Sequence, residues 1–393
     1  MFRPNFCVAI QMSRRNEEID GLRGWLSLSV CLYHGFLIPQ GDGIFPIFFA
    51  PITQTTSIHR KMILQIINGD LAVTIFFIMS GAVLFASLSE LSNKRGVLGL
   101  SLDFMIRRLF RIFPALIVAL CVFWGSYWLL QSAFPSVFHV YFTPGQFLSN
   151  LSLRRISMYG VSWSLQVELQ AVPFILLGFW LWRRAGDAGL AVYLALALLA
   201  RDAPWLTLNL TPLNDHLFLF VLGMLAVGPV GEAATRKLRD RGLLAIPLIT
   251  ILGASLVDYR AEMVRPFQGL LAALFVAALL HGRAARIGDM LRSRASQFLG
   301  RISYAFYVIN PIFLEFNRTV IAKVFGLPPA NFGSELLLGV SATACAVPLS
   351  ALCYRHVELP GIRAGKRVFP LLRKIARRDS NAAIESGERT QRP

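Results

Sequence analysis

Long apolar blocks recur along the whole chain, and they limit what it can fold into. Each block holds about 17–22 residues, and an α-helix of that length crosses the roughly 30 Å hydrocarbon core of a bilayer. Of the 393 residues, 55% are hydrophobic and only 16% are charged, whereas soluble domains carry about 25% charged residues. The blocks do not alternate polar and apolar residues as the strands of a membrane β-barrel do. The sequence therefore predicts an all-α, polytopic integral membrane protein.

The blocks predict about ten membrane-spanning helices. In chain order, the expected spans are residues 21–39, 70–88, 111–131, 161–182, 188–200, 213–230, 243–257, 264–281, 302–322 and 335–354. Residues 1–20 lack a signal peptide and are expected to form a cytoplasmic segment, followed by a transmembrane domain over 21–356. We expect the last helix to end near His356, before Pro360. Residues 357–393 then form a basic cytoplasmic tail with a disordered end.

The positions of the basic residues indicate the orientation in the membrane. Most of the 39 lysine and arginine residues lie in the two tails and in every second connection, on one side of the expected spans. Cytoplasmic loops carry such an excess of basic residues, so both termini are expected in the cytoplasm. The formal net charge of +17 has the same origin. Because this charge is scattered among short loops, it does not indicate nucleic-acid binding.

The cysteines show no pattern of a metal site or a disulfide framework. The chain has 5 cysteines, and no two of them are separated by two residues. Most lie in or near apolar blocks, where cysteine behaves as a small core side chain. No metal ion is therefore expected as a cofactor.

Two ionisable residues of the first block share one helix face. Arg23 and His34 are eleven residues apart, which is about three turns and roughly 16 Å along the axis. Counted from the expected membrane boundaries, His34 and Glu168 of the fourth span reach similar depths. Ionisable groups at such depth are costly and usually functional, so we interpret the pair as a base with an orienting carboxylate. The alternative is a structural hydrogen bond that joins two helices.

Two further arginines mark the start of the third span. Arg108 and Arg111 are three residues apart, so they share a helix face at the expected cytoplasmic end. They are either an anchor that extends to the membrane surface or a clamp for the phosphates of a nucleotide-containing donor. Spacing alone leaves both interpretations open.

Other polar residues inside the blocks give weaker signals. The ninth span contains Tyr304 and Asn310, and Pro311 removes a helix hydrogen bond there. The gap can open a cavity, although helix packing alone also explains these residues. Asp70 is expected near the outer interface, and His216, like the other histidines in loops or at span ends, is expected to be an ordinary interfacial residue.

Six motifs in this order resemble one known family. They are DGLRG with an arginine and a histidine separated by ten residues, FFIMSG, RRLFRIFP, SWSLQVE, ISYAFYVI and HVELPG. The set is similar to the acyltransferase-3 family of bacterial membrane O-acyltransferases, which modify cell-surface glycans, over about residues 19–363. Each motif is weak alone, but six in order are specific.

The resemblance implies a donor, an acceptor and a set of site residues. The implied donor is acyl-CoA on the cytoplasmic side of the bacterial inner membrane, with acetyl-CoA as the first candidate. The implied acceptor is a hydroxyl of a glycan or lipid-linked sugar reached from the outer side. The catalytic positions correspond to Arg23, His34 and Glu168, and the donor-binding positions to Arg108 and Arg111. The expected substrate-binding residues are Trp163, Ser164, Tyr304 and Asn310.

Two departures from the family pattern affect the expected mechanism. Many members carry a histidine where this chain has Asn310. No hydrolase-like extracytoplasmic domain follows the tenth expected span, so a second transfer step there would need a separate extracytoplasmic transferase. Acyl-CoA, the saccharide acceptor and membrane lipids are the other expected partners.

A transporter is the main alternative. A proton-coupled transporter or glycan flippase would use His34 and Glu168 as a proton relay. This alternative explains buried charges but neither the arginine pair at the cytoplasmic end nor the family motifs. A purely structural assembly protein would leave the intramembrane ionisable residues without a role.

Overall fold

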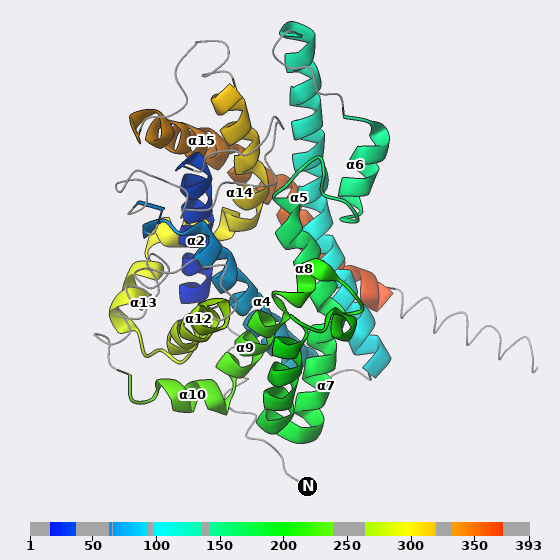
Figure 1. The fold of residues 1–393 in the computed structure, drawn as a ribbon, viewed down its shortest axis with the longest axis vertical. Coiled ribbons are helices and arrows are strands. Elements are labelled where there is room, and N and C mark those ends of the chain that lie inside the picture. Colours follow the sequence, from blue (N-terminus) through cyan, green and yellow to red (C-terminus); the bar gives the residue numbers. More distant parts are fainter. Residues whose placement is uncertain are drawn as a thin grey trace, which may run out of the picture.

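The computed structural model describes residues 16–36, 63–64, 66–92, 97–135, 142–238, 264–319 and 332–371, and every regular element in these ranges is helical (Figure 1). Four helices are long and apolar enough to cross a membrane, and six candidates result if each of two bent helix pairs counts as one span. The predicted all-α membrane fold is therefore confirmed. The predicted number of about ten spans stays a prediction, and the span at 243–257 lies outside the described residues.

A helix lies in each expected block that the structure describes, but α5 begins at Val97 and not near residue 111, and α14 begins at Arg294 and not near residue 302. They are α2 (Glu17–Phe36), α4 (Gly69–Ser92), α5 (Val97–Ala133), α6 (Pro144–Leu151), α7 (Ser162–Leu199), η2 (Pro204–Thr207), α8 (Thr211–Asn214), α9 (Leu217–Val227), α10 (Pro229–Thr235), α12 (Val264–Leu280), α13 (Ala285–Leu291), α14 (Arg294–Thr319), α15 (Phe332–Cys353) and the π-helical turn η4 (Tyr354–Glu358). α5 runs along much of the length of the molecule, with α6 beside its upper half (Figure 1).

α7 is a hairpin of two helical arms. Gly186 breaks the helix with φ of 62° and ψ of −148°, a backbone conformation that glycine adopts without a Cβ clash. The Tyr193 hydroxyl donates a hydrogen bond to the carbonyl of Phe174 at 2.9 Å, which a straight helix would not allow. The two arms correspond to the expected spans 161–182 and 188–200.

Two other blocks bend sharply. α9 and α10 meet at an angle of 78°, and α12 and α13 meet at 79°. Gly228 and Pro229 lie at the first break, where proline begins the next helix in a position that needs no backbone donor. In each case a short helix, α10 or α13, follows a longer apolar helix (Figure 1).

The last helix is longer than the sequence predicts. Instead of ending near His356, it passes through η4 and Pro360 and continues to Leu371. The π-helical turn widens the helix where a proline would otherwise clash with the preceding turn, so Pro360 is accommodated within the helix. The expected tail from residue 357 is therefore helical as far as Leu371. We call residues 359–371 the terminal helix segment.

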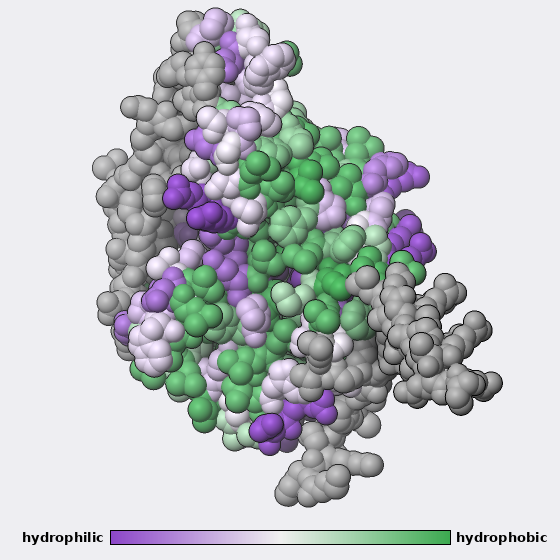
Figure 2. All heavy atoms as spheres, turned by 90° about the vertical axis from the view of Figure 1, so that its right-hand side faces the viewer, coloured by the Kyte–Doolittle hydropathy of each residue, from purple (hydrophilic) through white to green (hydrophobic). Residues whose placement is uncertain are grey.

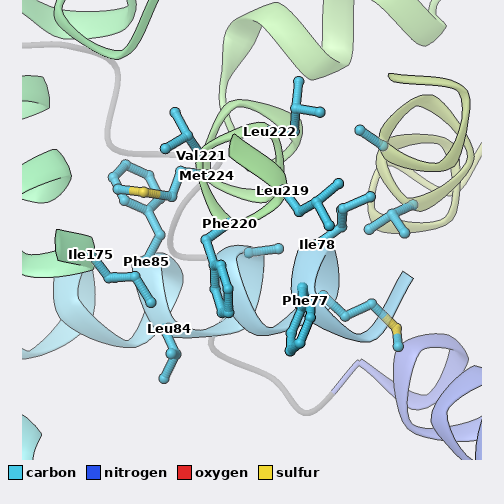
Figure 3. Packing of buried hydrophobic residues seen from close by; sticks show 14 of the residues in the cluster. Phe77, Ile78, Leu84, Phe85, Ile175, Leu219, Phe220, Val221, Leu222 and Met224 are labelled. Atoms are coloured by element: carbon cyan, nitrogen blue, oxygen red, sulfur yellow. The ribbon is translucent and has the colours of Figure 1, made fainter. Parts of the chain in front are cut away.

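The core forms where α4, α7 and α9 pack together. Figure 3 shows Phe77 and Phe85 of α4 facing Phe220 and Met224 of α9. The rings of Phe77 and Phe220 are stacked with centroids 5.1 Å apart. A Cβ on Gly81 would overlap the backbone of Phe220, so a small residue is required at this crossing. Close backbone approach of this kind is the main source of attraction between helices inside a membrane.

The outward face of α5 is apolar and exposed. Its exposed apolar side chains include Leu109, Ile117, Trp128 and Leu129. Figure 2 shows this side of the molecule with a broad hydrophobic area bordered by hydrophilic residues. A broad exposed apolar surface of this kind suits contact with lipid chains.

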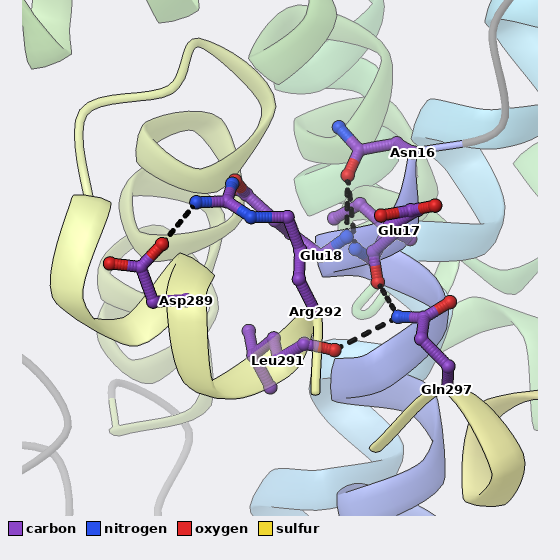
Figure 4. A network of polar contacts seen from close by, with 8 residues as sticks. Asn16, Glu17, Glu18, Asp289, Leu291, Arg292 and Gln297 are labelled. Atoms are coloured by element: carbon purple, nitrogen blue, oxygen red, sulfur yellow. Dashed lines mark hydrogen bonds and ion pairs between the residues drawn. The ribbon is translucent and has the colours of Figure 1, made fainter. Parts of the chain in front are cut away.

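A polar network joins α2 to α13 and α14 at the end of the bundle where α2 begins (Figure 4). The side-chain oxygen of Asn16 accepts hydrogen bonds from the backbone N–H groups of Glu18 and Ile19 at 3.0 and 3.1 Å, which caps α2. Arg292 pairs with Glu18 and, at 2.6 Å, with Asp289. These contacts fix the start of α2, and therefore the position of the residues that follow it.

Candidate active site

A cavity of about 240 Å³ lies between α2, α4, α5, α7, α14 and the terminal helix segment. We call it the inner cavity. Its charged and hydroxyl-bearing lining residues are Arg23, Arg107, Arg108, Arg111, Lys366, Glu168, Ser80, Ser87, Ser164, Ser303, Tyr304 and Tyr307. Five cations therefore surround one carboxylate among the described lining residues. Such an excess of fixed positive charge in a cavity favours an anionic ligand.

Glu168 is held by α4 and α5. Its carboxylate accepts a hydrogen bond from the Ser80 hydroxyl at 2.7 Å and lies 4.0 Å from an Nη atom of Arg108. The same guanidinium nitrogen donates to the Ser80 oxygen at 3.4 Å. Because a half-buried carboxylate is stabilised by a counter-charge and by hydrogen-bond donors, this arrangement supplies Glu168 with both and leaves some donors of Arg108 unused. The Nε atom of Arg108 is buried and has no partner among the described residues.

Two tyrosines of α14 form the inner wall of the cavity. The Tyr304 hydroxyl donates to the carbonyl of Ile112 at 2.6 Å, two residues before Pro114 of α5. The Tyr307 hydroxyl is 2.7 Å from the hydroxyl of Ser164. Tyr304 and Ser164 line the cavity, and these hydrogen bonds hold α5, α7 and α14 together. Their substrate-binding role stays a prediction.

His34 does not line the inner cavity, and Glu168 makes its hydrogen bond and ion pair with other residues. Arg318 donates to the backbone carbonyl of His34 at 2.9 Å, and the neighbouring Tyr33 hydroxyl donates to Asp70 at 2.8 Å. The expected pairing of His34 with Glu168 is thus not seen. Depth counted along two helices fixes the level of two residues, but it does not fix the direction in which each side chain points.

A second, smaller cavity lies at the opposite end of α4. We call it the outer cavity; it measures about 30 Å³, and its polar and aromatic lining residues are Asp70, Thr74, Trp163, Asp215, His216, Phe218, Arg265 and Gln268. Val73 lines both cavities, so they are separated by little more than one side chain. The outer cavity collects residues from the N-terminal ends of α4, α7, α9 and α12.

Trp163 and His216 belong to this outer cavity. Their rings lie 5.4 Å apart, and each also packs against Phe77, which lines the inner cavity. The Nδ1 atom of His216 is 2.7 Å from the carbonyl oxygen of Pro212. That contact fixes the proton on Nδ1 and leaves Nε2 as the acceptor nitrogen. His216 therefore lines a cavity, whereas the sequence predicted an ordinary interfacial residue.

Asn310 lies away from both cavities. Its amide nitrogen donates to the carbonyls of Phe306 and Tyr307 at 2.8 and 3.2 Å. Pro311 lacks the N–H group that would bond to the Tyr307 carbonyl, so the side chain repairs the helix locally. The amide oxygen is buried without a partner among the described residues.

Sequence reasoning missed several residues of the inner cavity. Ser80, Arg107 and Lys366 were not among the residues that the sequence assigned to the site. Arg107 precedes the arginine pair and forms an ion pair at 2.8 Å with Asp103, which lies one helix turn earlier. Arg107 was predictable from its place beside Arg108, but Lys366 was not, because the helix that carries it was expected to have ended. Within the described residues, no group of three or more metal-ligating side chains occurs.

Comparison with known proteins identifies the family of this chain. A family model described as an acyltransferase domain, that of the acyltransferase-3 family, matches residues 16–355. No curated protein and no solved structure matched the chain. The matched region contains every lining residue of the inner cavity except Ile362 and Lys366. Since the match covers most of the chain, the chain belongs to the acyltransferase-3 family and is a membrane acyltransferase.

Proposed function

We propose that this acyltransferase moves a short acyl group, with acetyl as the first candidate, from acyl-CoA to a hydroxyl of a surface glycan or lipid-linked sugar. The observation that carries the proposal is the inner cavity with five cations around one carboxylate. CoA bears a pyrophosphate and a further phosphate on its ribose. Arginine binds phosphates through paired, charge-assisted hydrogen bonds, so this cavity suits the charged part of the donor.

The donor enters at the end of the bundle where α2 begins, which we assign to the cytoplasm of a bacterial cell. Arg107 is 26% exposed and Arg108 is 10% exposed, so the cavity opens toward the first of these two residues. Basic residues concentrate in cytoplasmic connections, and acyl-CoA is a cytoplasmic metabolite in this assignment. The inner membrane is then the location of the enzyme.

Arg108 and Arg111 bind donor phosphates, while Arg23 orients the part of the donor that lies deeper. Glu168 holds Arg108 in place through the Ser80 bridge, at 2.7 Å from the serine hydroxyl. With these groups fixed, the thioester end of the donor extends along α4 toward the outer cavity. Binding energy from the phosphates then serves to position the reacting carbonyl.

His34 acts as the general base from the outer end of α2, in the position that the family motif gives it. The acceptor hydroxyl loses its proton to His34 as its oxygen attacks the thioester carbonyl carbon. The new C–O ester bond forms, the C–S bond breaks, and the CoA sulfur receives the proton from the histidine. Trp163, at the boundary of the two cavities, supplies an apolar ring against which a sugar can pack.

Mass spectrometry of surface glycans tests this function directly. The deletion strain is complemented with wild type, with His34→Ala or with His356→Ala, each present at the same level. His356 is exposed on η4 and serves as the control histidine. We expect an acyl mass increment to disappear in the deletion strain and to return with wild type and His356→Ala only.

Two results would contradict the proposal. Acylation that persists in the deletion strain would exclude this chain as the transferase. Glycan that is retained inside the cell, with its acylation unchanged, would favour the flippase. Acylation that also requires a separate extracytoplasmic transferase would show that the acyl group passes through a partner.

A further inference from the structure

The terminal helix segment contributes to the inner cavity although it follows the family domain. The family match ends at residue 355, whereas the helix continues to Leu371. Two of its side chains, Ile362 and Lys366, line the cavity. The π-helical turn η4 joins this segment to α15 and determines the face that it presents.

A glycine pair brings the segment close to α5. Gly361 and Gly365 are four residues apart, the spacing that allows two helix backbones to approach inside a membrane. A Cβ on Gly361 would lie 2.7 Å from the backbone oxygen of Phe110, and one on Gly365 would lie 2.7 Å from the Phe110 Cβ. Further along, a Cβ on Gly99 would lie 3.4 Å from the ring of Phe369, so the contact continues to the start of α5.

One stripe of this helix runs from the protein interior to the cavity mouth. Glu358, Ile362 and Lys366 are spaced four residues apart and therefore share a face. Glu358 is buried, Ile362 is half-buried and Lys366 is exposed. The charge of Glu358 interacts with those of Arg111 and Arg23, which lie deeper in the cavity. Lys366 is therefore at the entrance, on the side where Arg107 also lines the cavity.

Neighbouring cations on the same segment face elsewhere. Arg363 and Arg367 line a separate surface depression together with Pro360 and Leu371. Both are exposed, as Lys366 is. The segment thus offers matched controls that carry the same charge on the same helix, but on the face turned away from the inner cavity.

We propose that Lys366 binds the ribose 3′-phosphate of acyl-CoA, so that the terminal helix segment supplies a donor contact that the family domain lacks. This inference rests on the proposed function. Because the thioester must reach the acceptor, the acyl end of the donor lies deep and its nucleotide end stays at the mouth. The 3′-phosphate is the charged group at that nucleotide end, and a lysine at the entrance meets it first.

Thermal stability of the purified full chain in detergent tests the contact, with CoA and 3′-dephospho-CoA as the two ligands. A ligand that prefers the folded state raises the melting temperature according to its affinity. We expect wild type and Arg367→Ala to bind CoA about tenfold more tightly than dephospho-CoA, as one charge-assisted hydrogen bond allows. Lys366→Ala should bind both ligands equally, at the affinity that wild type has for dephospho-CoA.

The outcomes separate this inference from the proposed function. If wild type binds CoA and dephospho-CoA equally well, or if Lys366→Ala keeps the preference for CoA, Lys366 does not bind the 3′-phosphate, while the donor assignment stands. If neither ligand stabilises wild type at millimolar concentration, the donor assignment itself is wrong and the inference falls with it. Lys366→Arg, which keeps the charge, should retain most of the preference.

Discussion

The two cavities differ in size and in charge. The inner cavity has a volume of about 240 Å³ and is lined by five cations and one carboxylate, whereas the outer cavity has about 30 Å³ and contains two aspartates, one arginine and the rings of Trp163 and His216. Val73 lines both. The difference matches the two substrates of the proposed reaction, because the donor is a highly charged nucleotide and the acceptor is a neutral hydroxyl.

Phe77 of α4 connects the two cavities, because it lines the inner cavity and packs against Trp163 and His216 of the outer cavity. Phe77 also stacks on Phe220 where α4 crosses α9 (Figure 3). A Cβ on Gly81 of α4 or on Gly223 of α9 would overlap the backbone of the other helix. The two helices are therefore closely packed at this crossing, and this packing holds Phe77 in its position.

The largest effect is expected from substitution of His34, the proposed general base. His34→Ala should lower acyl transfer by about 10²–10⁴-fold without weakening CoA binding in the inner cavity. Turnover of purified enzyme and the melting temperature with CoA measure the two quantities separately. His216→Ala is the comparison: if it abolishes transfer while His34→Ala does not, the base belongs to the outer cavity.

A smaller loss is expected at the arginine that spans Glu168 and Ser80. Arg108→Ala should weaken CoA binding by roughly 10–100-fold, as expected for a charge-assisted hydrogen bond. It should also lower the melting temperature, since it leaves the half-buried Glu168 without its nearest counter-charge. The double variant with Glu168→Gln should regain stability but not affinity. Unchanged CoA affinity in Arg108→Ala would remove this residue from the donor site.

The helix crossing between the cavities can be tested by adding one methyl group. Gly81→Ala should destabilise the protein by about 1–3 kcal/mol because the helices must separate. Gly125→Ala is the control, since a Cβ there meets nothing within 4 Å, and it should be neutral or slightly stabilising. Melting temperatures of the two variants give the comparison. Equal stability would show that the α4–α9 crossing is not closely packed.

The smallest effect is expected from substitution of Trp163, whose indole ring lines the outer cavity. Trp163→Ala should raise the KM for the acceptor several-fold, because edge-to-face contacts of this kind contribute about 0.5–1.5 kcal/mol. CoA binding should not change, because Trp163 does not line the inner cavity. Initial rates at varied acceptor and varied donor separate the two constants. A change confined to the donor KM would mean that the cavities are not divided between the substrates.

Much of the fold was predictable because hydropathy depends only on local sequence. The apolar blocks predicted helices that the structure shows, and Gly186 lies between the expected spans 161–182 and 188–200. The family motifs likewise identified residues of the inner cavity, including Arg23, Arg108 and Glu168. The length of the last helix was not predictable, because a proline normally ends a helix and the π-helical turn that accommodates Pro360 has no local signature.

The sequence by itself determined that this chain is a helical membrane protein of the acyltransferase-3 family, since apolar length and motif order need no knowledge of packing. The tertiary structure decided which side chains meet. In the structure, Glu168 contacts Ser80 and Arg108 instead of His34. Trp163 packs against His216, and Lys366 lines the inner cavity at its mouth. The physical reason is that sequence fixes a residue's height along its helix, whereas the rotation and crossing of helices depend on close contacts such as those at Gly81 and Gly361.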